Sequence, residues 1–190
     1  MGLIKHLAAT LLMILPALAA DSYQIDPVHS EVSFRIRHLG IAKVYGRFSK
    51  FAGTITLDEK DLSKSGVDVS IEAASVNTDN AMRDKDLLSA NFFDTGKYPF
   101  LTFKSVAVKE VSKGNLEVLG DFTLHGTTRR ITIPVVSTGS VSTPKGVRAG
   151  FEGTLTLSRY DYGMNYMSGV VGEDVTITLG IEAVKTETKP

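Results

Sequence analysis

The sequence of 190 residues predicts an all-β fold, an up-and-down barrel of eight antiparallel strands with one short helix between the third and fourth. Three observations support this prediction. Apolar and polar residues alternate with the two-residue period of a β-strand in eight separate segments. One stretch alone interrupts the alternation with a helical spacing. Most connections between segments are short enough for hairpins, so we expect sequential strands to pair.

Each of the eight segments carries apolar side chains on one phase and mostly charged residues or threonines on the other. Strands of this kind bury their apolar face either between two sheets or inside a closed barrel, and periodicity alone does not separate these alternatives. An even number of sequentially paired strands closes naturally into a barrel. The apolar phases run over 32–36, 51–57, 67–73, 101–107, 116–124, 131–135, 147–157 and 175–183.

The interruption lies at residues 79–90 and follows Thr78, a residue type that is favoured at helix N-caps. Met82, Leu87 and Ala90 form an approximate helical stripe within it. The sequence therefore predicts one short helix at this place.

The first 19 residues are expected to be a cleavable export signal. Lys5 precedes the apolar run 7–18, and Ala17-Leu18-Ala19 supplies the small-x-small cleavage pattern. The alternative is a membrane anchor, but about a dozen apolar residues fall short of the ~20 that span a bilayer. Residues 20–184 are then predicted to form a single barrel domain, and 185–190 a flexible tail that is too polar to pack.

The composition excludes several classes of function. Lysine plus arginine and aspartate plus glutamate number 21 each, so there is no basic stripe of the kind that binds nucleic acid. Cysteine is absent, which excludes disulfides, thiolate metal sites and a cysteine nucleophile. No G-x-S-x-G segment or glycine-rich phosphate loop is present either.

The apolar phase of the strands contains unusually small residues, and this predicts a hollow interior. Gly53, Gly120 and Gly153 all fall on that phase, so the inner wall should carry few side chains at these points. An eight-stranded barrel is just wide enough for side chains to fill it, and a thinned wall would leave a dry space. The alternative is that these glycines mark bulges or bends. Four alanines share the phase: Ala73, Ala107, Ala149 and Ala183.

The elaborate connections all fall on one rim, because connections in an up-and-down barrel alternate between its two ends. This rim receives residues 38–47, the helix, the His125-Gly126 turn and the stretch 160–171, and we interpret it as the mouth. Its aromatic and methionine residues are available as a lid for an apolar ligand, or alternatively plug the barrel end as core. They are Met82, Phe92, Phe93, Tyr98, Tyr160, Tyr162, Met164, Tyr166 and Met167.

Polar residues supply no constellation for catalysis and none for a metal. His29, His38 and His125 match no metal-ligand spacing, and no cofactor is expected. His38 continues an inward phase, so it either contacts a ligand head group or is a satisfied rim histidine. Arg83 is the best counter-charge for an anionic head group, or else pairs on the helix with Asp79 or Asp86. We expect a binding protein rather than an enzyme.

The predicted ligand-binding residues combine inward-facing apolar side chains with rim residues that could contact a head group. They are Phe34, Ile36, His38, Phe51, Ile55, Met82, Arg83, Phe103, Phe122, Phe151, Leu155, Met164 and Tyr166.

Motifs spread from Tyr23 to about Ala183 resemble the YceI-like family of periplasmic polyisoprenoid-binding proteins. They are Asp26-Pro27-Val28-His29-Ser30, Arg37-His38-Leu39-Gly40, Ser75-Val76-Asn77-Thr78, Arg83-Asp84, Phe92-Phe93-Asp94, Tyr98-Pro99, Gly120 to Thr127 and Arg159 to Gly163. The resemblance implies a lipocalin-like barrel with an internal tunnel, a periplasmic location and a polyisoprenoid or quinone-like ligand, in a family most of whose members have no known catalysis.

The chain departs from the family's helix, which usually reads Arg-Asp-x-His-Leu-Arg-Ser. Asp86 replaces the histidine and Leu88 the arginine, which shifts the expected ligand from a pyrophosphate toward a neutral quinone, a fatty amide or a similar lipid. The expected partners are an isoprenoid or other long-chain lipid and a transient membrane surface, without nucleic acid, for a monomer or homodimer. The alternatives are a structural or stress-related interaction protein with a filled barrel, or a lipid-modifying enzyme.

Overall fold

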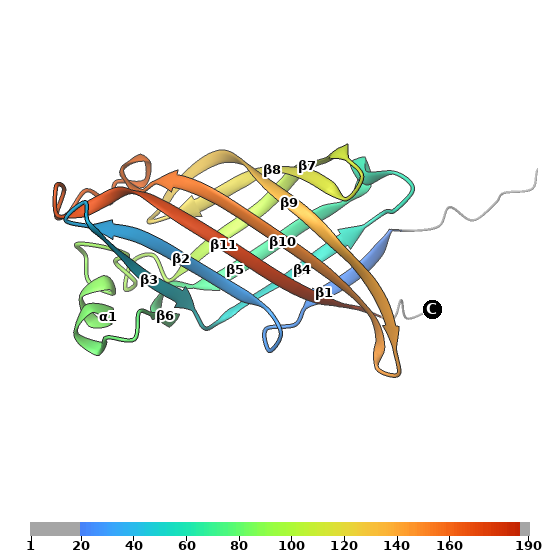
Figure 1. Ribbon diagram of the computed structural model, residues 1–190, viewed down its shortest axis with the longest axis horizontal. Coiled ribbons are helices and arrows are strands. Elements are labelled where there is room, and N and C mark those ends of the chain that lie inside the picture. The colour runs from blue at the N-terminus through green and yellow to red at the C-terminus, as the bar shows by residue number, and fades with distance from the viewer. Residues whose placement is uncertain (1–19, 187–190) are drawn as a thin grey trace, which may run out of the picture.

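Eleven strands form one antiparallel sheet in the computed structural model, which describes residues 20–186 (Figure 1). The strands are β1 (Asp21–Ile25), β2 (Glu31–His38), β3 (Ala42–Phe48), β4 (Phe51–Leu57), β5 (Gly66–Glu72), β6 (Val76–Asn77), β7 (Phe100–Ser112), β8 (Asn115–Leu124), β9 (Thr127–Thr143), β10 (Gly146–Ser158) and β11 (Val171–Lys185). Between them lie α1 (Ala81–Leu87) and the 3-10 turns η1 (Leu62–Lys64), η2 (Ala73–Ser75) and η3 (Arg159–Tyr162).

The sheet closes into a barrel because β1 pairs with both β4 and β11. The ring runs β1-β4-β5-β7-β8-β9-β10-β11, and β2, β3 and β6 continue the sheet from β11. Strands β1 and β2 share β11 as partner, since β1 pairs with residues 183–185 and β2 with residues 171–180. They act as one interrupted strand, and the predicted antiparallel barrel of eight strands is confirmed.

Three strands, β1, β3 and β6, were not predicted from the sequence. The connection expected over residues 38–47 is mostly β3, and only Leu39 to Ile41 form its turn. Position 46 of β3 requires glycine, because a Cβ there would lie 2.4 Å from Cζ of Phe34 on the neighbouring strand. This glycine interrupts the apolar phase by which β3 could have been recognised. The short strands β1 and β6 each have too few residues to show a period.

The helix is shorter than predicted and begins later. Asn80, rather than Thr78, caps α1, since its side chain accepts a hydrogen bond from the Arg83 backbone N–H at 3.0 Å. Met82 is 84% exposed, so the expected apolar stripe packs on the core through Leu87 only.

The predicted boundary between the barrel and the tail also changes. Lys185 still belongs to β11, and its Nζ donates to Asp21 Oδ2 at 2.5 Å, while the Thr186 N–H donates to the Ser22 carbonyl at 2.7 Å. Strand β11 therefore extends one residue into the predicted tail, and hydrogen bonds to Ser22 of β1 hold the next residue, Thr186. Residues 187–190 of the tail and the whole predicted signal, residues 1–19, lie outside the described residues.

A β-bulge reverses the phase of β7 and corrects its predicted inward face. The register shifts between Ser105 and Ala107, after which Val108 is buried while Ala107 is exposed. An alternation extrapolated along the sequence takes no account of the extra residue in a bulge. Every side chain after the bulge therefore points to the face opposite to the predicted one. Within residues 20–186, no helix is long and apolar enough to cross a membrane.

Candidate functional site

The barrel encloses an apolar cavity of about 260 Å³. Side chains from the strands of the ring and from β2 and β3 line it, and nearly all of them are apolar. At one end it reaches Leu87 of the helix and Phe92 after it, and at the other it reaches Ser65 and Gly66 at the start of β5. The interior is therefore a narrow hydrophobic tunnel rather than a fully packed core.

Nine of the predicted ligand-binding residues lie on the wall of this cavity. They are Phe34, Ile36, Phe51, Ile55, Phe103, Phe122, Phe151, Leu155 and Met164. The structure places the other four away from the wall. His38 is exposed at the end of β2, and Met82 and Tyr166 are 84% and 46% exposed.

Arg83, the fourth residue away from the wall, is bound to the segment that precedes the helix. Its Nε donates to Thr78 Oγ1 and its Nη2 to the Thr78 carbonyl, both at 2.7 Å. Asp84 Oδ1 accepts from the backbone N–H and the hydroxyl of the same threonine. The Arg83-Asp84 motif thus fixes the start of the helical segment, and neither Asp79 nor Asp86 is the partner that the sequence suggested.

The glycines of the inner wall do not create the hollow in the way predicted. A Cβ on Gly120 would lie 2.4 Å from Cζ of Phe103, and one on Gly53 would lie 2.9 Å from Cδ1 of Ile25. Neighbouring side chains therefore fill the space beside these glycines. The cavity is lined instead by larger side chains, and Gly53, Gly120 and Gly153 are not part of its wall.

The mouth end of the tunnel is covered by two segments. Leu87, Phe92 and Phe93 come from the helix and the residues after it, while Tyr162 and Met164 come from η3 and the following loop. Edge-to-face contacts hold them, with ring centroids 5.6 Å apart for Phe48 and Phe93 and for Phe122 and Tyr162. Phe92 packs in the same way on Tyr166 at 5.4 Å.

Arg159 is the one charged residue on the cavity wall among the described residues, and the sequence pointed to it only as the start of the motif Arg159 to Gly163. It is 4% exposed, and it donates to the carbonyls of Met164, Val171 and Gly172. Burial lowers the pKa of its guanidinium. These bonds fix both ends of the loop between η3 and β11, so Arg159 holds the loop that covers the mouth.

His125, in the turn between β8 and β9, also makes structural contacts with η3. Its Nδ1 lies 3.1 Å from the Tyr162 carbonyl, which can only accept, so this nitrogen carries the donated proton. Its ring packs edge-on against Tyr98 at 4.9 Å. The turn is thereby joined to η3.

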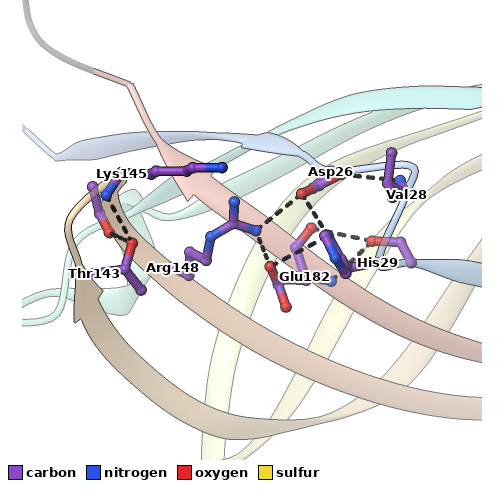
Figure 2. Close-up of polar contacts among 9 residues, drawn as sticks. Asp26, Val28, His29, Thr143, Lys145, Arg148 and Glu182 are labelled. Carbon is purple, nitrogen blue, oxygen red and sulfur yellow. Dashed lines mark hydrogen bonds and ion pairs between the residues drawn. The ribbon is translucent and has the colours of Figure 1, made fainter.

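A second polar cluster lies outside the barrel, where β1 ends and β2 begins (Figure 2). His29 Nδ1 and Arg148 Nη1 both lie 2.9 Å from Asp26 Oδ2, and Arg148 also donates to Glu182. The His29 ring, the Val28 N–H and Arg148 hold the pKa of Asp26 well below its usual range. Asp26, His29 and Ser30 belong to the motif Asp26-Pro27-Val28-His29-Ser30.

This cluster closes the gap between β1 and β2. Ser30 Oγ accepts a hydrogen bond from the Glu182 N–H at 2.9 Å and donates one to the Glu182 carbonyl. The serine hydroxyl thus makes the backbone contacts with β11 that a paired strand would make if the turn did not interrupt it. Asp26, His29 and Glu182 each bring a ligand atom within 4.8 Å of the others, as metal ligands do. Arg148, however, already contacts both carboxylates and supplies the positive charge between them.

We expect Asp26→Asn to lower the thermal unfolding midpoint at pH 7. The lowered pKa means that the ionised carboxylate stabilises the fold above the unfolded-state pKa of about 3.9. That contribution is lost as the pH falls through the folded-state pKa, so the difference between wild type and variant should shrink below about pH 4. Thermal unfolding followed by circular dichroism from pH 3 to 8 measures it.

Asp68→Asn is the matched control, because Asp68 is exposed on β5 and lies 3.8 Å from Lys104. A surface pair of this kind contributes little, so this variant should follow wild type at every pH. A constant gap between Asp26→Asn and wild type down to pH 3 would contradict the assigned role of the carboxylate.

A family model and individual relatives both match the chain to YceI-like proteins. A sequence model of the YceI-like domain matches residues 23–183. A UPF0312 protein of Pseudomonas paraeruginosa is 41% identical over 172 residues, or 89% of each chain. Protein YceI of Escherichia coli is 40% identical over 172 residues, again 89% of each chain.

Solved structures share the fold. BcnA of Burkholderia cenocepacia superposes with a TM-score of 0.78 at 22% identity, over 84% of this chain and 99% of its own. A polyisoprenoid binding domain from Saccharophagus degradans, implicated in plant cell wall breakdown, gives a TM-score of 0.66 at 17% identity, over 86% and 98% of the two chains. At these identities the likeness establishes the barrel alone.

Proposed function

The chain belongs to the YceI-like family, and on that premise we propose that it is a periplasmic carrier that holds a long apolar lipid in its barrel. The observation that carries the proposal is the tunnel, which is lined almost wholly by hydrocarbon and aromatic side chains. A lining of this kind excludes water and favours a ligand without polar groups along its length.

The length of the tunnel favours a lipid longer than an ordinary acyl chain. Cavity-lining residues on β11 extend from Val171 to Ile181, roughly 30 Å along the strand at about 3.3 Å per residue. With a strand tilt of about 40°, this corresponds to ~25 Å along the barrel axis. One leaflet of a bilayer is about 15 Å thick, so an acyl chain would fill only part of the tunnel. This length therefore favours a longer apolar tail, such as that of a polyisoprenoid or an isoprenoid quinone.

Reversible loading follows from where the lipid starts. Removing a methylene from water is worth about 0.8 kcal/mol, so ~40 carbons would nominally gain ~30 kcal/mol, beyond the practical limit of about 20 kcal/mol. A membrane lipid is already out of water, however, and moving its tail into the barrel changes the free energy little. The protein then needs only to match the lipid environment, and it can both load and release.

The proposed head group is neutral, as in a quinone or a fatty amide. Arg159, the charged residue on the described cavity wall, already donates to three carbonyls, and Arg83 is bound to Thr78. Uncharged oxygen acceptors thus already occupy Nε and Nη2 of Arg83 and bind all three nitrogens of the Arg159 guanidinium. The replacement of two basic residues by Asp86 and Leu88 in the helical segment points the same way.

The proposed carrier would take its lipid from a membrane surface through the mouth and shield it in the periplasm. The titratable side chains described above serve structural contacts, and we propose binding rather than catalysis. Lid movement at the segments 87–93 and 162–164 would admit the tail.

The test is to identify a bound molecule. The full-length precursor is expressed in a bacterium with an export pathway, and the protein recovered from the periplasm without detergent is analysed by native mass spectrometry. We expect a stoichiometric apolar adduct, or stoichiometric loading when a C40 isoprenoid alcohol or quinone is supplied from detergent. Repeated failure to find either a co-purified or a loadable ligand would overturn the proposal.

A further inference from the structure

Apolar side chains are exposed at the tip of the β2–β3 hairpin, at the mouth end of the barrel. Leu39 is 54% exposed and Ile41 is 86% exposed. The Leu39 N–H donates to the Val170 carbonyl at 2.7 Å, which joins this tip to the loop before β11. That loop exposes Tyr166 and Met167, and Figure 1 shows both connections at the same end of the barrel as α1.

The backbone conformation at the tip disfavours leucine, so the fold does not account for the exposed Leu39. Leu39 and Gly40 are the central residues of the turn from His38 to Ile41, with φ values of 52° and 72°. This type I′ arrangement favours Asn, Asp or Gly at the first central position, because other residues rarely adopt positive φ. The chain instead holds a leucine in an unfavourable conformation and directs it into solvent. Met167 also has a positive φ, of 54°.

The hairpin is basic, although the chain as a whole is neutral. Residues 32–57 contain no aspartate or glutamate, and they include Arg35, Arg37, Lys43, Arg47 and Lys50. Arg47 and Lys50 are paired with Asp79 and Glu72. Within residues 20–186, the ion pairs leave Arg35, Arg37 and Lys43 without a carboxylate partner. Arg37 and Lys43 face each other across the hairpin and flank its apolar tip.

We propose that the hairpin tip, Leu39 to Ile41 with Arg37 and Lys43, docks the mouth of the barrel on an anionic phospholipid surface. Apolar side chains at the tip, with the pair of cations Arg37 and Lys43 behind them, match the interface of such a bilayer, where the side chains enter the acyl boundary and the cations contact phosphates. This inference rests on the proposed lipid carriage, and it names the surface from which the lipid would be taken.

Flotation with large unilamellar vesicles tests the proposal, using the mature chain and either phosphatidylcholine alone or a mixture with phosphatidylglycerol. We expect binding to the anionic vesicles that weakens as salt is raised. Leu39→Asn with Ile41→Gln should lower the affinity at least about tenfold, since burying one such side chain is worth about that factor. Asn suits the turn, so the double variant should keep or raise the thermal midpoint.

Val141→Gln is the matched control, because Val141 is 58% exposed on β9 near the opposite end of the barrel. It should bind vesicles like wild type. The chain contains no tryptophan, so Ile41→Trp and Val141→Trp give background-free probes. Brominated acyl chains should quench the first and leave the second unchanged.

Loading from detergent separates this inference from the proposed function. The double variant should still take up a C40 isoprenoid alcohol supplied in micelles, as judged by native mass spectrometry. If wild type and double variant bind anionic vesicles equally, or if wild type prefers neutral vesicles, the docking surface is wrong even when loading succeeds. If vesicles bind as expected but no lipid loads, lipid carriage fails and the docking surface stands.

Discussion

Leu155→Trp should abolish lipid loading while leaving the barrel folded. Leu155 lines the tunnel from β10, beside Ile177 of β11. An indole at this position would extend into the narrow lumen and occupy the path of the tail. We expect at least a tenfold loss of the bound or loaded adduct in native mass spectrometry. The existing cavity gives the larger ring room, so the cost in stability should stay within the ~1–3 kcal/mol typical of overpacking.

Thr154→Trp provides the matched control, because Thr154 precedes Leu155 on the same strand and points to solvent. The two variants carry the same new side chain on opposite faces of the wall. Thr154→Trp should load lipid like wild type. Equal loading by both variants would contradict the tunnel as the binding site, and loss in both would indicate a general effect on the strand.

Gly120→Ala should destabilise the barrel more than its single added methyl suggests. The new Cβ would lie 2.4 Å from Cζ of Phe103 and 2.6 Å from the Lys104 carbonyl oxygen. The carbonyl belongs to the β7–β8 pairing and cannot move cheaply, so the ring must shift toward the lumen. We expect a loss of about 2–3 kcal/mol, or roughly 4–12 °C in the thermal midpoint for a domain of this size.

Gly180→Ala is the control for this experiment. Gly180 lies within β11, and no heavy atom comes within 4 Å of the position of its added Cβ. Replacing glycine where the backbone is ordinary reduces the freedom of the unfolded chain, so the change should be neutral or slightly stabilising. Thermal and denaturant unfolding of both variants measure the difference. Equal stabilities would show that the contact between Phe103 and Gly120 is not tight.

The sequence alone determined the number and order of the main strands and most of the residues that face inward. Alternation is a local property of an extended chain, because successive side chains point to opposite sides whatever the partner strand is. Residues such as Phe34, Phe122 and Leu155 could therefore be assigned to the cavity wall from the alternation of apolar and polar residues.

Only the tertiary structure decided where that local rule fails. The bulge after Ser105 inverts β7 because of its pairing with β8, and nothing in the residues themselves marks it. The rim residues have no period, so packing between segments distant in sequence sets which of them face the cavity. Tyr162 and Met164 line it, whereas Tyr166, Met82 and His38 do not.

The polar contacts also depend on closure of the barrel. Arg148 meets Asp26 across 122 positions of sequence, and Arg159 reaches carbonyls that come together only when the loop before β11 folds back. A sequence pattern reports which face of a strand is buried. It carries no information on which strands close the ring, and closure is what encloses the tunnel and brings these charges together.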